Sequence, residues 1–318
     1  MKNNTLILAL GLCASLVSSG ALAETRITYK SAKTGSSYYQ MGVQLAEAMK
    51  AGTNGDIIVT VEESQGSVQN VMETKARGGD YVFTTPPVLV KLAQGGKAMF
   101  EGKGDPKFDE IRALFPIPSL TMHFVMSADS GITDFAGMEG KTILLGKGSF
   151  GATEGEKYLK LFGLEGKVNL AEVELSNAVP ALKNGQIDGF VTAGSWPAPN
   201  VIEAAASADV VVLSLSDEQI TETKRSKLVI PAGTYSGQTA DIATTSLPVA
   251  AFTTTAMSDD AAYQLTKTFW ESKATMAEDA PWWTGVDADL MANISTKLHP
   301  GAIRYYTEAG VELTADQQ

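Results

Sequence analysis

Three loops rich in serine and glycine are the parts of this chain whose residue types could do chemistry. They cover residues 33–39 (KTGSSYY), 64–70 (SQGSVQN) and 147–151 (KGSFG). Each follows an apolar, β-branched stretch and precedes residues with helical spacing, so each stands where a strand gives way to a helix. Backbone N–H groups at helix N-termini and serine hydroxyls can hold a small anion such as a carboxylate. The same residues also serve as caps and turns, but three equivalent loops favour binding.

The candidate ligand residues come from these loops, from a strand end and from two later turns. Lys33 and Lys147 are the loop cations, and either could pair with a carboxylate or be an exposed surface lysine. Trp196 could cover the apolar part of a ligand or pack beside a rigid turn. Asn70 lies one helical turn beyond Ser67, so we expect both on one side of a helix. The full set is Lys33, Thr34, Ser36, Ser37, Tyr38, Gln65, Ser67, Asn70, Thr85, Lys147, Ser149, Gly151, Trp196 and Tyr235.

Catalytic and cofactor chemistry find little support in the sequence. His123 and His299 are the only histidines, and neither has a cysteine or carboxylate at the spacing of a metal site. We therefore interpret both as structural. Phosphate-loop and dinucleotide fingerprints are missing, and no serine stands in a convincing nucleophile elbow. The sequence predicts a binding protein without catalytic residues, metal or cofactor.

The first 23 residues have the features of a cleaved signal peptide. Lys2 supplies a positive start, residues 6–17 are apolar or small, and Ala21-Leu22-Ala23 forms a small-x-small cleavage signal. The apolar run is too short for the roughly 20 residues of a membrane-spanning helix. We expect export to the periplasm. Cys13, the only cysteine, lies in this segment, so the mature protein is expected to be cysteine-free and stabilised by packing.

Charge and composition narrow the classes of partner. The chain of 318 residues carries 25 basic and 36 acidic side chains, a formal net charge of −11. A nucleic-acid partner is disfavoured, because phosphates need a basic surface. Hydrophobic residues make up 44% of the sequence, which is typical of a globular protein with a substantial core.

Strands and helices alternate in two cycles, which predicts the α/β class with parallel sheets and crossover helices. In the first cycle each expected strand, at residues 26–29, 57–61 and 81–83, precedes a helix. The second cycle has expected strands at 142–146, 168–173 and 189–192, with helices at 153–162 and 178–182. Further strands are expected at 111–115, 123–126, 209–213 and 244–255, and helices at 261–273 and 302–309.

The two cycles imply two similar lobes with a cleft between them. We place the crossings between lobes near residues 118–126 and 242–252. The expected boundaries are a signal peptide at 1–23, lobe 1 at 24–120 plus 245–318, and lobe 2 at 121–244. The C-terminal helices could span both lobes.

Five segments together resemble the TAXI family of extracytoplasmic solute receptors, which serve tripartite ATP-independent periplasmic (TRAP) transporters. These are residues 34–42, 66–70, 184–189, 231–238 and 299–306, and the resemblance covers nearly all of the chain after residue 23. It implies a two-lobed periplasmic-binding-protein fold with a ligand in the interlobe cleft. It also implies an organic anion such as glutamate as ligand and an ion-driven permease as partner.

Carried over by position, Ser67 and Asn70 match the family's polar binding turn, and residues 34–39 match its first ligand loop. The chain departs from the family at Ala32-Lys33, where a glycine pair is usual, at Ser36, where glycine is common, and at 150–152, where serine-glycine-threonine is common. Phenylalanine at position 150 would make one wall more apolar, which favours a ligand with a hydrophobic portion.

The expected function is therefore a monomeric periplasmic receptor that binds a small organic acid or amino acid and delivers it to a TRAP membrane permease. Two alternatives remain open. The chain could present its ligand to a receptor kinase as a sensor module. A periplasmic hydrolase would need a nucleophile and a base in contact, which the scarcity of histidine disfavours.

Overall fold

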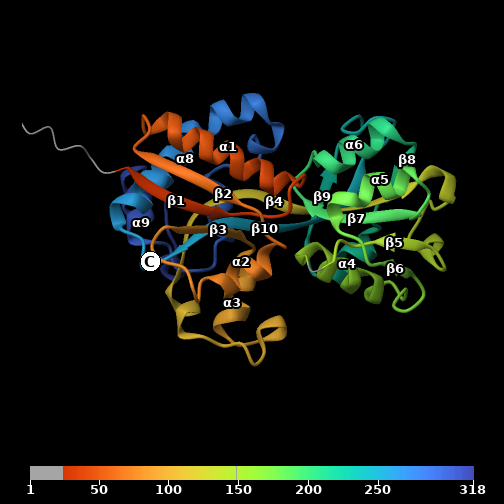
Figure 1. Ribbon diagram of the computed structural model, residues 1–318, viewed down its shortest axis with the longest axis horizontal. Helices are drawn as coiled ribbons and strands as arrows, with labels where there is room; N and C mark the ends of the chain where they lie inside the picture. Colours follow the sequence, from red (N-terminus) through yellow and green to blue (C-terminus); the bar gives the residue numbers. More distant parts are fainter. Residues whose placement is uncertain (1–23, 148) are drawn as a thin grey trace, which may run out of the picture.

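The computed structural model describes residues 24–147 and 149–318. The predicted signal peptide, with Cys13, lies outside the described residues. The helices that are described include none long and apolar enough to cross a membrane. The elements form two α/β lobes side by side, joined by two long strands (Figure 1).

Lobe 1 is built on three parallel strands with helices on both faces (Figure 1). Here β1 is the central strand, and β2 and β3 flank it. Two C-terminal helices complete this lobe. The elements are β1 (Thr25–Lys30), α1 (Ser37–Gly52), β2 (Ile57–Glu62), α2 (Ser67–Glu73), β3 (Tyr81–Thr85), α3 (Pro87–Gln94), α8 (Asp259–Asp279) and α9 (Pro300–Glu308).

Lobe 2 repeats this plan with β5 parallel to both β6 and β7. Its elements are β5 (Thr142–Leu144), α4 (Phe150–Leu161), β6 (Asn169–Ala171), α5 (Ala178–Lys183), β7 (Gly189–Gly194), α6 (Pro199–Ser207), β8 (Val210–Val212), α7 (Asp217–Thr223) and β9 (Ser226–Ile230). The sequence analysis did not predict α6, α7 or β9. Their signals are nevertheless present, since Pro199 occupies a helix start and Ser216 with Gln219 forms a capping box before α7.

Two long antiparallel strands, β4 (Ile111–Ser127) and β10 (Ile242–Thr254), run through both lobes. In lobe 1, β10 pairs with β3 and β4; in lobe 2, β4 pairs with β7 and β10 pairs with β9. The predicted break within 111–126 was wrong, because β4 is one strand. Pro118 lies at a register shift in the pairing of β4 with β10. The regular hydrogen bonding between the strands is already interrupted there, so a residue without an N–H is tolerated. The prediction of parallel pairing is confirmed only for β1 to β3 in lobe 1 and for β5 to β7 in lobe 2.

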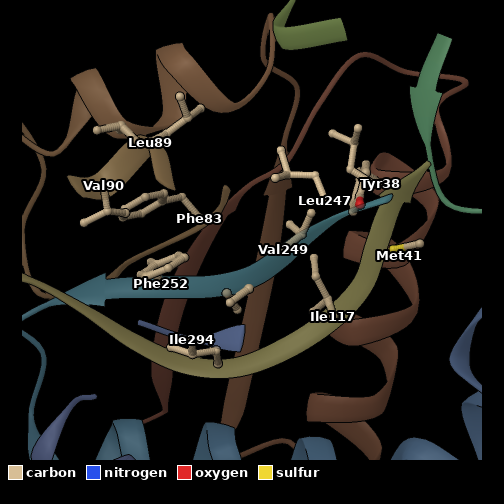
Figure 2. Close-up of a cluster of buried hydrophobic side chains, with 14 of the residues drawn as sticks. Tyr38, Met41, Phe83, Leu89, Val90, Ile117, Leu247, Val249, Phe252 and Ile294 are labelled. Atoms are coloured by element: carbon tan, nitrogen blue, oxygen red, sulfur yellow. The ribbon is translucent and has the colours of Figure 1, made fainter. Parts of the chain in front are cut away.

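The core of lobe 1 fills the space between the sheet and its helices. Phe83 and Phe252 stack from neighbouring strands, and Leu89 and Val90 cover them from α3 (Figure 2). On the other face of the sheet, Phe115 of β4 stacks on Phe269 of α8 with ring centroids 4.1 Å apart (Figure 1). Lobe 2 has its own core, centred on Leu144, Phe190, Val201, Ile230 and Tyr235. The loops at the strand ends extend from these two cores.

Candidate functional site

The polar loops of the two lobes meet around a cavity of about 50 Å³, here called the cleft cavity. Lobe 1 contributes the loops after β1 and β2, and lobe 2 contributes the loop after β5 and the end of β7. In α/β sheets these carboxyl ends of strands are the usual place for ligands. The lining residues are Ala32, Lys33, Ser36, Tyr38, Gln65, Gly66, Ser67, Leu120, Leu145, Ser149, Gly151, Leu175, Val191, Thr192 and Ala193.

The first loop presents Ser36 and Tyr38 to the cavity. Ser36 is the N-cap of α1: its Oγ accepts the N–H of Tyr39 at 3.3 Å and donates to the carbonyl of Lys33 at 2.7 Å. The Tyr38 hydroxyl donates to the carbonyl of Pro118 at 2.8 Å, and burial raises the pKa of Tyr38 well above its usual value. Tyr38 therefore stays protonated and joins lobe 1 to the crossing strand.

The second loop turns sharply at Gly66, whose φ of +115° suits glycine. The Gln65 N–H donates to the side-chain oxygen of Gln69 at 2.8 Å, and Ser67 opens α2 beside the cavity. The buried Oε1 of Gln65 has no hydrogen-bond partner within residues 24–147 and 149–318. A buried acceptor without a partner is unfavourable, so an N–H or O–H of a ligand would satisfy it.

The lobe 2 wall is built in the same way. Ser149 is the N-cap of α4, with its Oγ accepting the N–H of Ala152 at 3.0 Å and donating to the carbonyl of Gly146 at 2.8 Å. A Cβ placed on Gly151 would come within 3.0 Å of the Ala193 Cβ, so a small residue is needed for α4 to approach β7. Two helix N-termini, those of α1 and α4, thus border one cavity from opposite lobes.

Lys33 links the lobes electrostatically. Its Nζ lies 3.1 Å from Glu174 of lobe 2 and 3.9 Å from Glu63 of lobe 1. A ligand carboxylate would compete with these two for the cation. Lys147 behaves differently: it is exposed, lies 2.6 Å from Glu172 and is not among the described lining residues. The hydrogen bond with Glu172 raises the pKa of Lys147.

Asn70 lies behind the cavity wall and is not one of the described residues that line it. Its Nδ2 donates to the carbonyls of Ser31 at 2.7 Å and Thr84 at 2.9 Å. These bonds tie α2 to β1 and β3. From the sequence we expected Asn70 and Ser67 on one side of the helix, as ligand residues. In the structure, the side-chain amide of Asn70 is already hydrogen-bonded to backbone carbonyls.

The remaining candidates are not among the described residues that line the cleft cavity. Ser37 is buried, and its Oγ accepts the N–H of Ser195 from lobe 2 at 2.9 Å. Thr34 is exposed, and its N–H donates to Glu63 at 3.2 Å. Thr85 is fully buried at the end of β3. Trp196 lines a separate, larger cavity, described below.

Tyr235 belongs to the core of lobe 2. Its hydroxyl lies 2.8 Å from His123 Nε2 and accepts the N–H of Ala198 at 3.0 Å. Burial lowers the pKa of His123 to about 4, so this histidine is neutral at pH 7. His299 is the N-cap of α9, accepting the Gly301 N–H at 3.2 Å. His299 thus uses both ring nitrogens in structural hydrogen bonds, and His123 uses its Nε2.

An apolar wall went unnoticed in the sequence. Leu120, Leu145, Leu175 and Val191 line the cleft cavity together with the polar loop residues. They look like ordinary core residues of strands and turns in the sequence, and only the fold brings β4, β7 and the loops after β5 and β6 to one place. The site can therefore hold a polar group and a hydrocarbon part at once.

The cleft cavity offers donors, acceptors and one cation, and neither histidine is among its described lining residues. Over residues 24–147 and 149–318, no three histidine, cysteine, aspartate or glutamate side chains come together as a metal site. What the described residues can do is bind a solute by hydrogen bonds, charge and apolar contact.

Two α/β lobes, joined by long crossing strands and facing each other across a cavity with polar and apolar walls, define the periplasmic-binding-protein fold. The chain belongs to the NMT1-like family, whose model matches residues 30–310.

Solved structures agree with this fold at low sequence identity. The periplasmic binding protein BugD has a TM-score of 0.57 at 12% identity, with 90% of this chain and 98% of BugD covered. A structure described as a periplasmic transporter has a TM-score of 0.56 at 9% identity, covering 90% and 92%. A protein of Bordetella bronchiseptica RB50 has a TM-score of 0.52 at 15% identity, covering 93% and 85%.

Proposed function

We propose that this protein is a periplasmic solute receptor for a small organic anion, a carboxylate or an amino acid such as glutamate. One observation carries the proposal: the cleft cavity is lined from both lobes by helix-cap serines, by Lys33 and by Gln65, whose Oε1 has no hydrogen-bond partner among the described residues. Such a cavity gains its full set of contacts only when the lobes come together around a ligand.

Each kind of lining group has a counterpart in such a solute. The ligand carboxylate replaces Glu174 beside Lys33, near the positive ends of α1 and α4. An amino or hydroxyl group donates to Gln65 Oε1. The carbon skeleton lies against Leu120 and Leu145.

The lobes move to admit the solute. The cleft cavity, about 50 Å³, is much smaller than the roughly 300–1,000 Å³ of typical small-molecule sites, so entry requires the loops to separate. We place the hinge where β4 and β10 change partners between lobes, at residues 118–126 and 242–252, with lobe 1 at 24–120 plus 245–318. Ligand binding then favours the closed form.

We propose a TRAP-type permease as the partner that takes the solute. Support comes from the resemblance of five segments to TAXI receptors, not from the geometry of the site. Uptake by membrane vesicles that contain the permease should depend on added receptor. A receptor that binds solute but never supports uptake would favour the sensor alternative.

The binding function is tested by a thermal-shift screen of organic acids and amino acids. A solute that binds only the folded state stabilises it by about 2.7 kcal/mol at a hundred times its dissociation constant. We expect at least one compound to raise the melting temperature and to be recovered unchanged by mass spectrometry. Chemical turnover of the bound compound would support a hydrolase, and a screen without any hit would contradict the proposal.

A further inference from the structure

A second cavity, of about 450 Å³, lies where both lobes meet the crossing strand. Lobe 2 contributes Ser195 and Trp196 after β7 and Leu228 of β9, and lobe 1 contributes the turn after α8. We call it the hinge cavity. Its lining is Pro118, Ser119, Thr121, Ser195, Trp196, Leu228, Pro281, Trp282, Thr284 and Gly285.

The hinge cavity and the cleft cavity lie on opposite faces of β4. Leu120 lines the cleft cavity, whereas its neighbours Ser119 and Thr121 line the hinge cavity. Leu120 and Thr121 pair regularly with β10, so their side chains point to opposite faces of the sheet. The two cavities are therefore separate sites that share one strand.

Trp196 and Trp282 form walls of the hinge cavity. Trp282 is held by its indole N–H, which donates to the Gln44 Oε1 of α1 at 3.2 Å. The same oxygen accepts the indole N–H of Trp283 at 2.7 Å, and Trp283 is fully buried. The turn that carries Trp282 is thus anchored to α1. Fixed aromatic walls favour a ligand with an aromatic ring, which can stack or meet them edge to face.

Ser195 supplies a polar group to the same cavity. Ser195 is one of the lining residues, its side chain is buried, and its Oγ has no hydrogen-bond partner in the described part of the chain. Its backbone N–H is already used by Ser37. Buried hydroxyls are nearly always hydrogen-bonded, so a ligand oxygen or nitrogen at this position would complete the hydroxyl's bonding.

We propose that the hinge cavity is a second ligand site, for an uncharged small molecule with one aromatic ring and one hydroxyl or carbonyl group. Its volume lies in the roughly 300–1,000 Å³ range of small-molecule sites. Among the described residues that line it none is charged, and burying an unpaired ligand charge there would be unfavourable. Because both lobes form walls, an occupant favours one lobe angle and is coupled to binding in the cleft.

The ligand class is tested with benzyl alcohol, benzoate and benzylammonium, which share a ring and differ in charge. Each is titrated into ¹⁵N-labelled protein while the indole N–H signals of its 4 tryptophans are followed by NMR. Benzyl alcohol should shift Trp196 and Trp282 but not Trp270, whose indole N–H donates to Tyr306 within lobe 1. The charged compounds should shift none. Absent shifts at Trp196 and Trp282, or equal shifts with charged compounds, would overturn the proposal.

Variants test the role of Ser195. Ser195→Ala should lower the affinity for benzyl alcohol about 2- to 10-fold and leave that for toluene, which lacks the hydroxyl, unchanged. Ser207→Ala, at an exposed serine of α6, is the matched control. Ser119→Trp should fill the cavity and abolish binding of both compounds. Unaltered benzyl alcohol affinity in both cavity variants would contradict the assignment. These titrations need no cleft solute, so their failure is distinct from failure of the proposed receptor function.

Discussion

The side-chain amide of Asn70 joins three segments of lobe 1 by donating to carbonyls of β3 and of the end of β1. We expect Asn70→Ala to lower the free energy of unfolding by about 1–3 kcal/mol, because buried carbonyls lose their donor. Ser67→Ala is the comparison variant, since Ser67 is half-buried, lines the cleft cavity and should matter more for solute affinity than for folding. Urea unfolding measures the stability of both variants. Equal stability of wild type and Asn70→Ala would contradict this account of Asn70.

His123 should make stability depend on pH. Burial lowers its pKa to about 4 from the ordinary 6.5, so between these pH values the unfolded chain binds a proton that the folded protein does not. Stability therefore falls as the pH is lowered from 6.5 to 4, by at most about 1.4 kcal/mol per pH unit and roughly 3 kcal/mol in all.

His123→Gln removes this titration and should flatten that part of the pH profile, measured by urea unfolding at several pH values. Burial also lowers the pKa of His299, so its contribution remains in the variant. Identical profiles for the two proteins would show that His123 titrates normally in the folded state.

At the level of single residues, the sequence predicted Ser36, Ser149 and Lys33 as candidates because hydroxyl residues and cations in loops at strand-to-helix junctions can cap a helix or hold an anion. It did not distinguish Lys33 from Lys147, which occupy equivalent loops. The difference comes from neighbours far along the chain: Glu174 reaches Lys33 across the cleft, whereas Glu172 pairs with Lys147 at the surface. Tyr235 likewise lies in a turn motif, but the fold directs its ring into the lobe 2 core.

At the level of elements, the loops after β1 and β6 are joined across the cleft by Lys33 and Glu174. We expect Glu174→Gln to shift the solute-free protein toward the open form. A partly exposed ion pair contributes up to about 1 kcal/mol, so the ratio of open to closed molecules should rise by no more than about 5-fold. Small-angle scattering should record a larger radius of gyration.

Glu63→Gln is the matched control, because Glu63 also lies within reach of Lys33 but belongs to the same lobe. It should leave the radius of gyration unchanged. The same expansion in both variants, or in neither, would argue against an interlobe role for the Lys33–Glu174 pair.

Helices and strands with a regular spacing of apolar residues were predicted well. The long strand β4, which crosses between the lobes, was not. Helix α1 and strands β1 to β3 have regular apolar spacing and defined ends. Strand β4 contains Pro116 and Pro118, which normally interrupt a sheet. Its continuity depends on the register shift in its pairing with β10, which no local pattern reveals.

For the whole molecule, the repeated α/β cycles were enough to predict two lobes and a cleft between them. The identity of the solute was not predictable in the same way. The cleft cavity is also lined by Leu120 of β4, by Val191 of β7, and by Leu145 and Leu175 of the loops after β5 and β6, and these residues, far apart in the sequence, meet only in the folded protein.

The most direct test of the receptor function compares two serines that cap helices in the same way. Ser149 caps α4 at the cleft cavity, and Ser258 caps α8 at an exposed position of lobe 1. Each alanine variant should lose about 1 kcal/mol of stability.

Calorimetric titration with the best solute from the thermal-shift screen then separates binding from capping. We predict one solute per chain, an affinity at least about 5-fold weaker in Ser149→Ala, and an unchanged affinity in Ser258→Ala. Wild-type affinity in Ser149→Ala, or equal losses in the two variants, would contradict the claim that the solute binds in the cleft cavity.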